Sequence, residues 1–268
     1  MQLSEPTLRR IKKTACPIYR LAPRATPELI GSAVLLRVGE LNFLCTATHV
    51  LDARESADLL LPNGDYLEPF AATAVRTSAP GAGISDPYDI AFMYLNDAYS
   101  QRFAHYEFVR VPDGVDQDDV PCDGRIYSFV GYPETKNRSM ASALSVRADS
   151  RIFSGASLSP VEYDSLHYNH ATHLVVAFNK KKMAASDGSV QAPPDPHGLS
   201  GGPVWRIGDV PQLVNQTNVE KLVGIAIEYR NNALVSVRIS VVLEMIRLSF
   251  PIAGTLIARS KYVGVVRT

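Results

Sequence analysis

Cysteine is scarce in this chain, whose 268 residues include three: Cys16, Cys45 and Cys122. So small and odd a number does not suit a fold held together by disulfides, and it is typical of a reducing compartment. Charge of one sign is also missing, because 27 Lys and Arg balance 27 Asp and Glu. A neutral chain gives no reason to expect nucleic acid as a partner.

Long apolar runs are absent as well. No stretch reaches the roughly 18 consecutive apolar residues that a membrane helix needs, so no membrane span is predicted. Residues 1–13 carry charges with no apolar segment behind them, which does not match a secretory signal. Together with the cysteines, these absences predict a cytoplasmic protein.

The composition that is present is typical of a globular protein rich in loops. Hydrophobic residues make up 46% of the chain, with 17 Gly and 18 Pro. From Ile30 onward, short apolar segments alternate with turn residues, which predicts an all-β protein. A short helix is expected within residues 1–15, and the spacing of residues 241–248 predicts another. The expected strands are 32–38, 41–46, 59–61, 73–76, 90–95, 108–111, 125–133, 143–147, 173–178, 202–206, 222–227 and 233–237.

One motif carries a candidate nucleophile. Gly198-Leu199-Ser200-Gly201-Gly202-Pro203 presents a serine among glycines that leave room for a substrate backbone. A serine hydroxyl is a poor nucleophile unless a base takes its proton. Two upstream segments supply that chemistry. His49 follows Cys45-Thr46-Ala47-Thr48, and a histidine near neutrality can act as general base and then general acid. Asp89 can orient the imidazole and stabilise its charged form.

Asp86 competes with Asp89 for the role of the orienting acid. Asp89 is favoured because it directly precedes Ile90-Ala91-Phe92-Met93-Tyr94-Leu95, an apolar run that would bury it. A buried carboxylate is costly unless it is paired, and a pair with His49 meets that need. The alternative for either aspartate is a turn cap beside Pro87.

The three segments, in the order His, Asp, Ser, resemble the signature blocks of chymotrypsin/trypsin-like serine peptidases, nearest to the intracellular bacterial and HtrA-like protease domains. The resemblance implies two six-stranded antiparallel β-barrels with the catalytic groups between them. It also implies an oxyanion hole formed by the N–H groups of Gly198 and Ser200. The implied organisation is an N-terminal extension (1–25), a first barrel with His49 and Asp89 (26–118), a second barrel with Ser200 (119–240), and a C-terminal helix and tail (241–268). The acidic segment 112–124 is interpreted as the linker between the barrels.

The sequence departs from the family in two places. Leu199 stands where zymogen-type relatives have an aspartate before the serine, so activation through a salt bridge to a new N-terminus is not expected. Val50 follows His49, so Cys45 cannot form the bridge that secreted relatives have around the histidine.

The resemblance also implies where substrate would bind. The walls of the specificity pocket are expected just before the serine, at Asp195 and His197, and along the later strand at Ala226, Ile227 and Glu228. Asp195 or Glu228 would attract a basic side chain, and a surface acid is the plainer interpretation of each. Backbone groups of the 226–228 segment would pair with an extended substrate.

Three histidines at three-residue spacing, His167, His170 and His173, raise the question of a metal site. That spacing aligns side chains only on a helix, and no cysteine or carboxylate completes a familiar ligand set. They are interpreted as loop histidines, so no metal and no cofactor are expected.

The leading hypothesis is a serine endopeptidase that forms an acyl-enzyme at Ser200. Its partners would be a polypeptide substrate and a possible regulatory or client protein, with no nucleic acid and no membrane. Two alternatives remain: a non-catalytic binding module on the same scaffold, and an esterase or other acyl hydrolase with the same triad.

Overall fold

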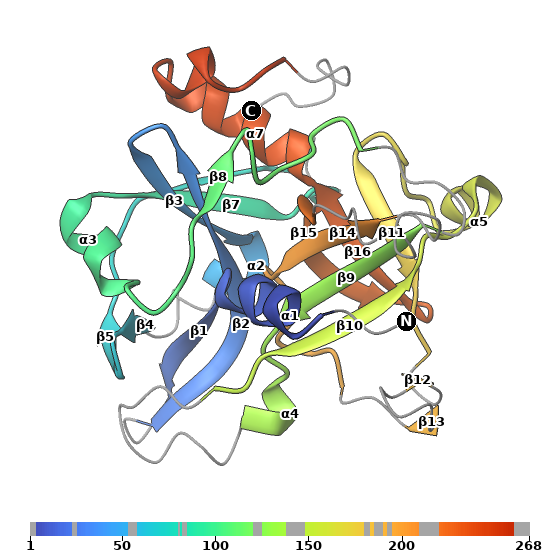
Figure 1. Ribbon diagram of the computed structural model, residues 1–268, viewed down its shortest axis with the longest axis horizontal. Helices are drawn as coiled ribbons and strands as arrows, with labels where there is room; N and C mark the ends of the chain where they lie inside the picture. The colour runs from blue at the N-terminus through green and yellow to red at the C-terminus, as the bar shows by residue number, and fades with distance from the viewer. Residues whose placement is uncertain are drawn as a thin grey trace.

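Two β-sheets lie side by side in the computed structural model, with helix α7 (Ile239–Ser249) across one end of the molecule (Figure 1). The expected strand 143–147 and Cys122 lie outside the described residues. In the part of the chain that is described, no helix is long and apolar enough to cross a membrane. The structure describes residues 4–22, 26–52, 58–79, 81, 85–119, 125–137, 148–179, 183–184, 190–191, 195–208 and 220–259.

The first sheet contains eight strands in the order β5-β4-β1-β2-β3-β7-β6, with β8 beside β2. Neighbouring strands are antiparallel, except that β8 runs parallel to β2. Among the described residues no pairing joins β5 to β6, so this sheet is an open half-barrel. Its strands are β1 (Ala15–Ala22), β2 (Thr26–Val38), β3 (Leu41–Ala47), β4 (Leu59–Asn63), β5 (Tyr66–Pro69), β6 (Ala74–Arg76), β7 (Ile90–Leu95) and β8 (Val109–Val111).

The second sheet contains six antiparallel strands in the order β10-β9-β14-β15-β16-β11. A bridge between Ser157 and Val176 brings its two outer strands together. The strands are β9 (Ile126–Gly131), β10 (Arg151–Ala156), β11 (His173–Ala177), β14 (Pro203–Gly208), β15 (Lys221–Arg230) and β16 (Ala233–Arg238). A separate hairpin is formed by β12 (Met183–Ala184) and β13 (Val190–Gln191).

Helices are few and short apart from α7 and the N-terminal helix α1 (Glu5–Lys13). Ser4 caps α1, because its hydroxyl accepts a hydrogen bond from the N–H of Thr7. The other helices are α2 (Thr48–Asp52), α3 (Asp97–Arg102), α4 (Glu134–Asn137), α5 (Pro160–Ser165) and the 3₁₀ turn η3 (Ala253–Thr255).

The all-β prediction with a C-terminal helix is therefore confirmed, and the strand arrangement differs in detail. The first sheet has eight strands where six were expected. Residues 15–22, expected in an extension, form β1 and pair with β2 along their whole length. Pro17 lies within β1 and lacks an N–H donor. The neighbouring strand β4 pairs with β1 only at Tyr19 and Arg20, so the missing donor breaks no ladder bond there.

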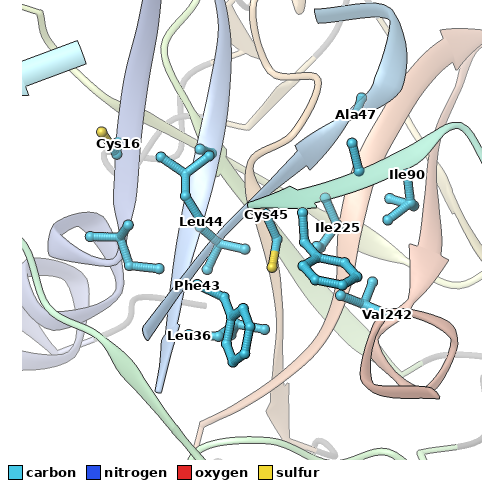
Figure 2. Close-up of a cluster of buried hydrophobic side chains, with 14 of the residues drawn as sticks. Cys16, Leu36, Phe43, Leu44, Cys45, Ala47, Ile90, Ile225 and Val242 are labelled. Carbon is cyan, nitrogen blue, oxygen red and sulfur yellow. The ribbon is translucent and has the colours of Figure 1, made fainter. Parts of the chain in front are cut away.

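The core between the sheets is a single apolar cluster. Six of the seven residues of β3 are buried, so both faces of this strand are covered. Figure 2 shows Cys45 of β3 beside Ile225 of β15 and Val242 of α7, all members of that cluster. Burial of side chains from both sheets and from α7 in one cluster fixes the relative position of the two sheets.

Candidate active site

His49 lies at the start of α2, directly after β3 ends at Ala47. Two backbone hydrogen bonds hold this turn against Asp89. The N–H of Thr48 donates to the carbonyl of Asp89 at 2.9 Å, and the N–H of His49 donates to Asp89 Oδ1 at 3.0 Å. Asp89 therefore fixes the backbone at His49 and also contacts the imidazole ring of His49.

The ring of His49 is paired with the carboxylate of Asp89. His49 Nδ1 lies 2.5 Å from Asp89 Oδ2. A carboxylate only accepts hydrogen bonds, so Nδ1 carries the proton and Nε2 keeps a lone pair. Burial lowers the pKa of His49, but the hydrogen bond to Asp89 and the charges of Asp89, Asp52 and Glu228 raise it by more. The net pKa lies above the ordinary value of the residue.

Asp86, the competing acid, has a different role. Its carboxylate accepts from the hydroxyl of Thr77 and from the N–H of Tyr88, the latter at 3.0 Å. This is the geometry of a turn cap two residues before its donor. Asp86 shapes the turn that leads to Asp89, whose backbone has a φ of 51°.

The loop from His197 to Gly202, called the serine loop below, fits tightly between the two sheets because of its glycines. Gly198 has a φ of 94°, and a Cβ there would lie 2.3 Å from the carbonyl oxygen of Tyr132. Gly201 has a φ of 86°, and a Cβ there would lie 1.9 Å from the carbonyl oxygen of Ser32. Both positions need glycine for conformation and for space.

Leu199 anchors the same loop from the other side. Its side chain is 3% exposed and belongs to the apolar cluster inside the second sheet. A Cβ on Gly131 of β9 would lie 2.9 Å from the Leu199 side chain, so the leucine lies directly against β9. A buried apolar contact therefore holds the residue before Ser200 in place.

Ser32 of β2 ties the serine loop to the first sheet. Its N–H donates to the carbonyl of Ser200 at 2.8 Å, and its hydroxyl donates to the carbonyl of Gly198 at 2.7 Å. The same hydroxyl accepts from the N–H of Tyr132 at 3.0 Å. The loop is thus held by both sheets, with Ser32 fully buried at the junction.

Ser200 and the His49 turn meet at Gly31. A Cβ on Gly31 would lie 2.7 Å from both methyl groups of Val50 and 3.2 Å from the carbonyl oxygen of Ser200. Gly31 is therefore in direct contact with the side chain of Val50. Cys45 lies within β3, where it is paired with Val34 and Phe92.

The hydroxyl of Ser200 does not bond to His49 in this structure. It donates to the carbonyl of Ile227 at 3.0 Å. Ile227 is the extra residue of a β-bulge, since Ala226 pairs with Ser236 and Glu228 with Val235. The structure thus brings His49 and Asp89 together, and the Ser200 hydroxyl is turned to the carbonyl of Ile227 on β15.

The N–H groups of Gly198 and Ser200 donate to no acceptor in the described part of the chain. The peptide between His197 and Gly198 is held by its carbonyl, which accepts from the N–H of Glu134 at 2.8 Å. In a trans peptide the N–H points away from the carbonyl, so the Gly198 donor faces away from α4. Within the described residues, the N–H groups of Gly198 and Ser200 are thus two backbone donors without an acceptor.

The expected substrate-binding residues have different environments. Ala226 is 4% exposed, and both its N–H and its carbonyl are used, bonding to Gly202 and Gly201. Its N–H is therefore not available to a substrate. Ile227 and Glu228 line a cavity of about 580 Å³ together with His49 and Asp89. The carboxylate of Glu228 accepts from the hydroxyl of Tyr168 at its wall.

Asp195 and His197 form a hydrogen-bonded pair at the N-terminal end of the serine loop. The carboxylate of Asp195 bonds to both the ring and the N–H of His197. The His197 side chain is 73% exposed and that of Asp195 is 34% exposed. This pair is accessible to solvent next to Gly198.

The three spaced histidines do not come together as a ligand set. His173 is buried, and each of its ring nitrogens already has a protein partner, Pro87 or Thr172. His167 lines the cavity, and His170 is exposed on a turn. Among the described residues no group of three or more potential ligands is placed to hold a metal ion.

Three contributors to this site were not found from the sequence: Ser32, the N–H of Glu134 and His173. No local signal could have found them, because each acts on a distant segment. Ser32 and Gly198, for example, are 166 residues apart in the chain.

No protein-family model matches the chain, and no curated protein matches its sequence. Among solved structures, the crystal structure of the serine endoprotease from Yersinia pestis is similar to it, with a TM-score of 0.49 and 14% sequence identity. The match covers 92% of this chain and 68% of that chain. The likeness is one of fold alone.

Proposed function

We propose that this chain is a serine endopeptidase whose triad is Ser200, His49 and Asp89. The observation that supports it best is the hydrogen bond from His49 Nδ1 to Asp89, which leaves Nε2 of the neutral ring to act as a base towards Ser200 in the proposed reaction. Both buried thiols are poor rivals as nucleophiles, because burial raises the pKa of Cys16 and of Cys45.

The proposed reaction begins with a rotation of the Ser200 side chain away from Ile227. His49 Nε2 takes the hydroxyl proton as the oxygen attacks the carbonyl carbon of the scissile peptide. The N–H groups of Gly198 and Ser200 stabilise the developing oxyanion. His49 then returns the proton to the leaving amine, and water hydrolyses the acyl-enzyme through the same groups.

The geometry of β15 suits a mechanism in which a bound substrate displaces the Ser200 hydroxyl from its hydrogen bond. Ile227 offers the carbonyl to which Ser200 is bonded, at the edge of the cavity that contains His49. An extended polypeptide that donates an N–H to this carbonyl would take the place of the hydroxyl. Polypeptide is therefore the proposed substrate class, and the reaction as proposed uses no cofactor.

A labelling experiment tests the nucleophile. A fluorophosphonate probe is expected to modify the wild-type protein once, at Ser200, as read by intact mass and peptide mapping. Ser200→Ala is expected to abolish labelling. Ser165→Ala, which changes an exposed serine on α5, is the matched control and should label like wild type. Labelling of Ser200→Ala at the wild-type rate would show that the nucleophile is wrongly assigned.

Peptide profiling separates a peptidase from an esterase. Mass spectrometry of a peptide mixture should show cleavage products with the wild type, at a rate that Ser200→Ala lowers by roughly 10⁴–10⁶-fold. Hydrolysis of activated esters without peptide products would favour an acyl hydrolase.

One observation favours a second candidate, a non-catalytic binding module. The Ser200 hydroxyl is bonded to Ile227 and not to His49. A protein that binds peptides in the cleft without labelling or cleavage would establish this candidate in place of the first.

We propose that the protein acts in the cytoplasm. We also propose that it has a further partner, a regulatory or client protein. The sparse cysteines support the first, since Cys16 and Cys45 are free thiols. Cell fractionation and capture with the Ser200→Ala protein test the two proposals.

A further inference from the structure

A histidine of the second sheet contacts the turn that leads to Asp89. His173 is 3% exposed and begins β11. Its Nε2 lies 2.8 Å from the carbonyl oxygen of Pro87, two residues before Asp89. A carbonyl only accepts, so Nε2 carries the proton and donates to it. The other nitrogen, Nδ1, lies 2.9 Å from the hydroxyl oxygen of Thr172.

The ring of His173 also supports the next residue of the turn. The ring of Tyr88 stacks on it with centroids 6.0 Å apart and planes at 11°. Tyr168 packs against the same imidazole at 5.1 Å. His173 thus contacts both residues that separate Asp86 from Asp89. These contacts cross from the second sheet to the first, where Asp89 lies.

The turn needs such support because of the conformation of Asp89. Its φ of 51° is in the left-handed region, which costs free energy for a residue with a side chain. A conformation of this kind persists only where the surroundings hold it. Within the first sheet, Asp86 holds the start of the turn through Thr77, and Thr48 holds its end. Pro87 and Tyr88, between them, are held by His173.

We propose that His173 is a positioning residue for Asp89, holding the Pro87–Tyr88 segment so that the carboxylate stays aligned with His49. The consequence for catalysis rests on the proposed function. The consequence for the His49–Asp89 pair does not, because that hydrogen bond is present in the protein without substrate.

Burial lowers the pKa of His173 by more than the carbonyls of Pro87 and Asn169 and the charge of Glu228 raise it, so the net pKa lies below the ordinary value. A neutral imidazole with its proton on Nε2 can donate to the carbonyl of Pro87, as this contact requires.

The test compares His173→Leu, which removes the donor, with His173→Gln, whose amide can still donate towards Pro87. NMR titration of the histidines in the full chain gives the pKa of His49. In His173→Leu this pKa should fall towards the ordinary value of about 6.5, and His173→Gln should restore much of the wild-type value. His170→Leu, an exposed histidine three residues away, is the matched control and should change nothing.

Kinetics give the second measurement. His173→Leu should lower kcat about 10–100-fold, the usual effect of losing a group that orients a catalytic residue, and leave KM within about twofold. The loss should vanish in a double-mutant cycle with Asp89→Asn, because the residue through which His173 acts is then disabled. If His173→Leu does not fold, Tyr88→Leu removes the stacking partner from the other side and should shift the His49 pKa in the same direction.

The two levels of failure can be told apart. An unchanged His49 pKa in folded His173→Leu, or an equal loss of kcat in the Asp89→Asn background, would overturn the positioning role. Absence of turnover in the wild type would overturn the proposed function alone, since the NMR titration still reports on the pair.

Discussion

Replacing Ser32 by alanine should disturb the serine loop while leaving its sequence intact. The hydroxyl of Ser32 donates to the carbonyl of Gly198 at 2.7 Å and accepts from the N–H of Tyr132 at 3.0 Å. Ser32 is fully buried, so water cannot replace the hydroxyl without a rearrangement. Ser32→Ala leaves one carbonyl and one N–H without a partner.

The expected cost follows from those two groups. Each buried polar group left unpaired costs about 1–3 kcal/mol, so Ser32→Ala should lower the free energy of unfolding by about 2–6 kcal/mol. Domains of this kind are stable by about 5–15 kcal/mol, so the variant should still fold. The loss is concentrated at Gly198, whose N–H is a proposed oxyanion donor. A displacement of about 1 Å there would lower kcat about 10²-fold.

Urea unfolding and steady-state kinetics on a cleaved peptide measure both effects. Ser236→Ala is the matched control, because Ser236 is equally buried but its hydroxyl donates to the carbonyl of Leu174 on β11 at 3.3 Å and not to the serine loop. It should cost about 0.5–1.5 kcal/mol and leave kcat unchanged. The reasoning would be refuted if Ser32→Ala kept the wild-type kcat, or if Ser236→Ala lost as much of it.

Three further predictions concern the same site. The pKa of His49 is raised, and the base must be neutral to accept a proton. The labelling rate of Ser200 should therefore increase with pH through an inflection above about 6.5. An inflection below that value would contradict the pairing of His49 with Asp89. Gly31→Ala should impair folding and labelling, since its Cβ would lie 2.7 Å from the methyl groups of Val50, and adding Val50→Ala should relieve both defects; no relief would mean that the clash is elsewhere. Leu199→Ala should lower the free energy of unfolding by about 2–5 kcal/mol in urea, and a variant as stable as wild type would rule out the leucine as an anchor.

The sequence predicted the parts of the site whose chemistry is local. Ser200 is recognised by the glycines beside it, and His49 and Asp89 by the apolar strands that precede and follow them. The choice of Asp89 over Asp86 also followed from sequence, because the buried strand begins directly after Asp89. In the structure Asp89 meets His49, and Asp86 caps the turn. The strand alternation likewise gave most of both sheets.

The sequence misled where a local rule had an exception. Residues 1–25 were expected to form an extension, but Pro17 lies inside β1 at a stretch that β4 leaves unpaired, an exception to the rule that proline is rare in strands. The family resemblance implied that Ala226 would lie along the substrate with its backbone groups available for pairing. The bulge at Ile227 and the close approach of the serine loop use its backbone groups instead. Neither a bulge nor a distant loop can be read from residue types.

The amino-acid sequence by itself determined which residues are candidates for nucleophile, base and acid, because these are properties of single side chains and their immediate neighbours. Only the tertiary structure decided how they are held. Ser32 and His173 act across the junction of the two sheets on segments far away in the chain. Contacts of that kind depend on how the sheets pack, which no short stretch of sequence specifies.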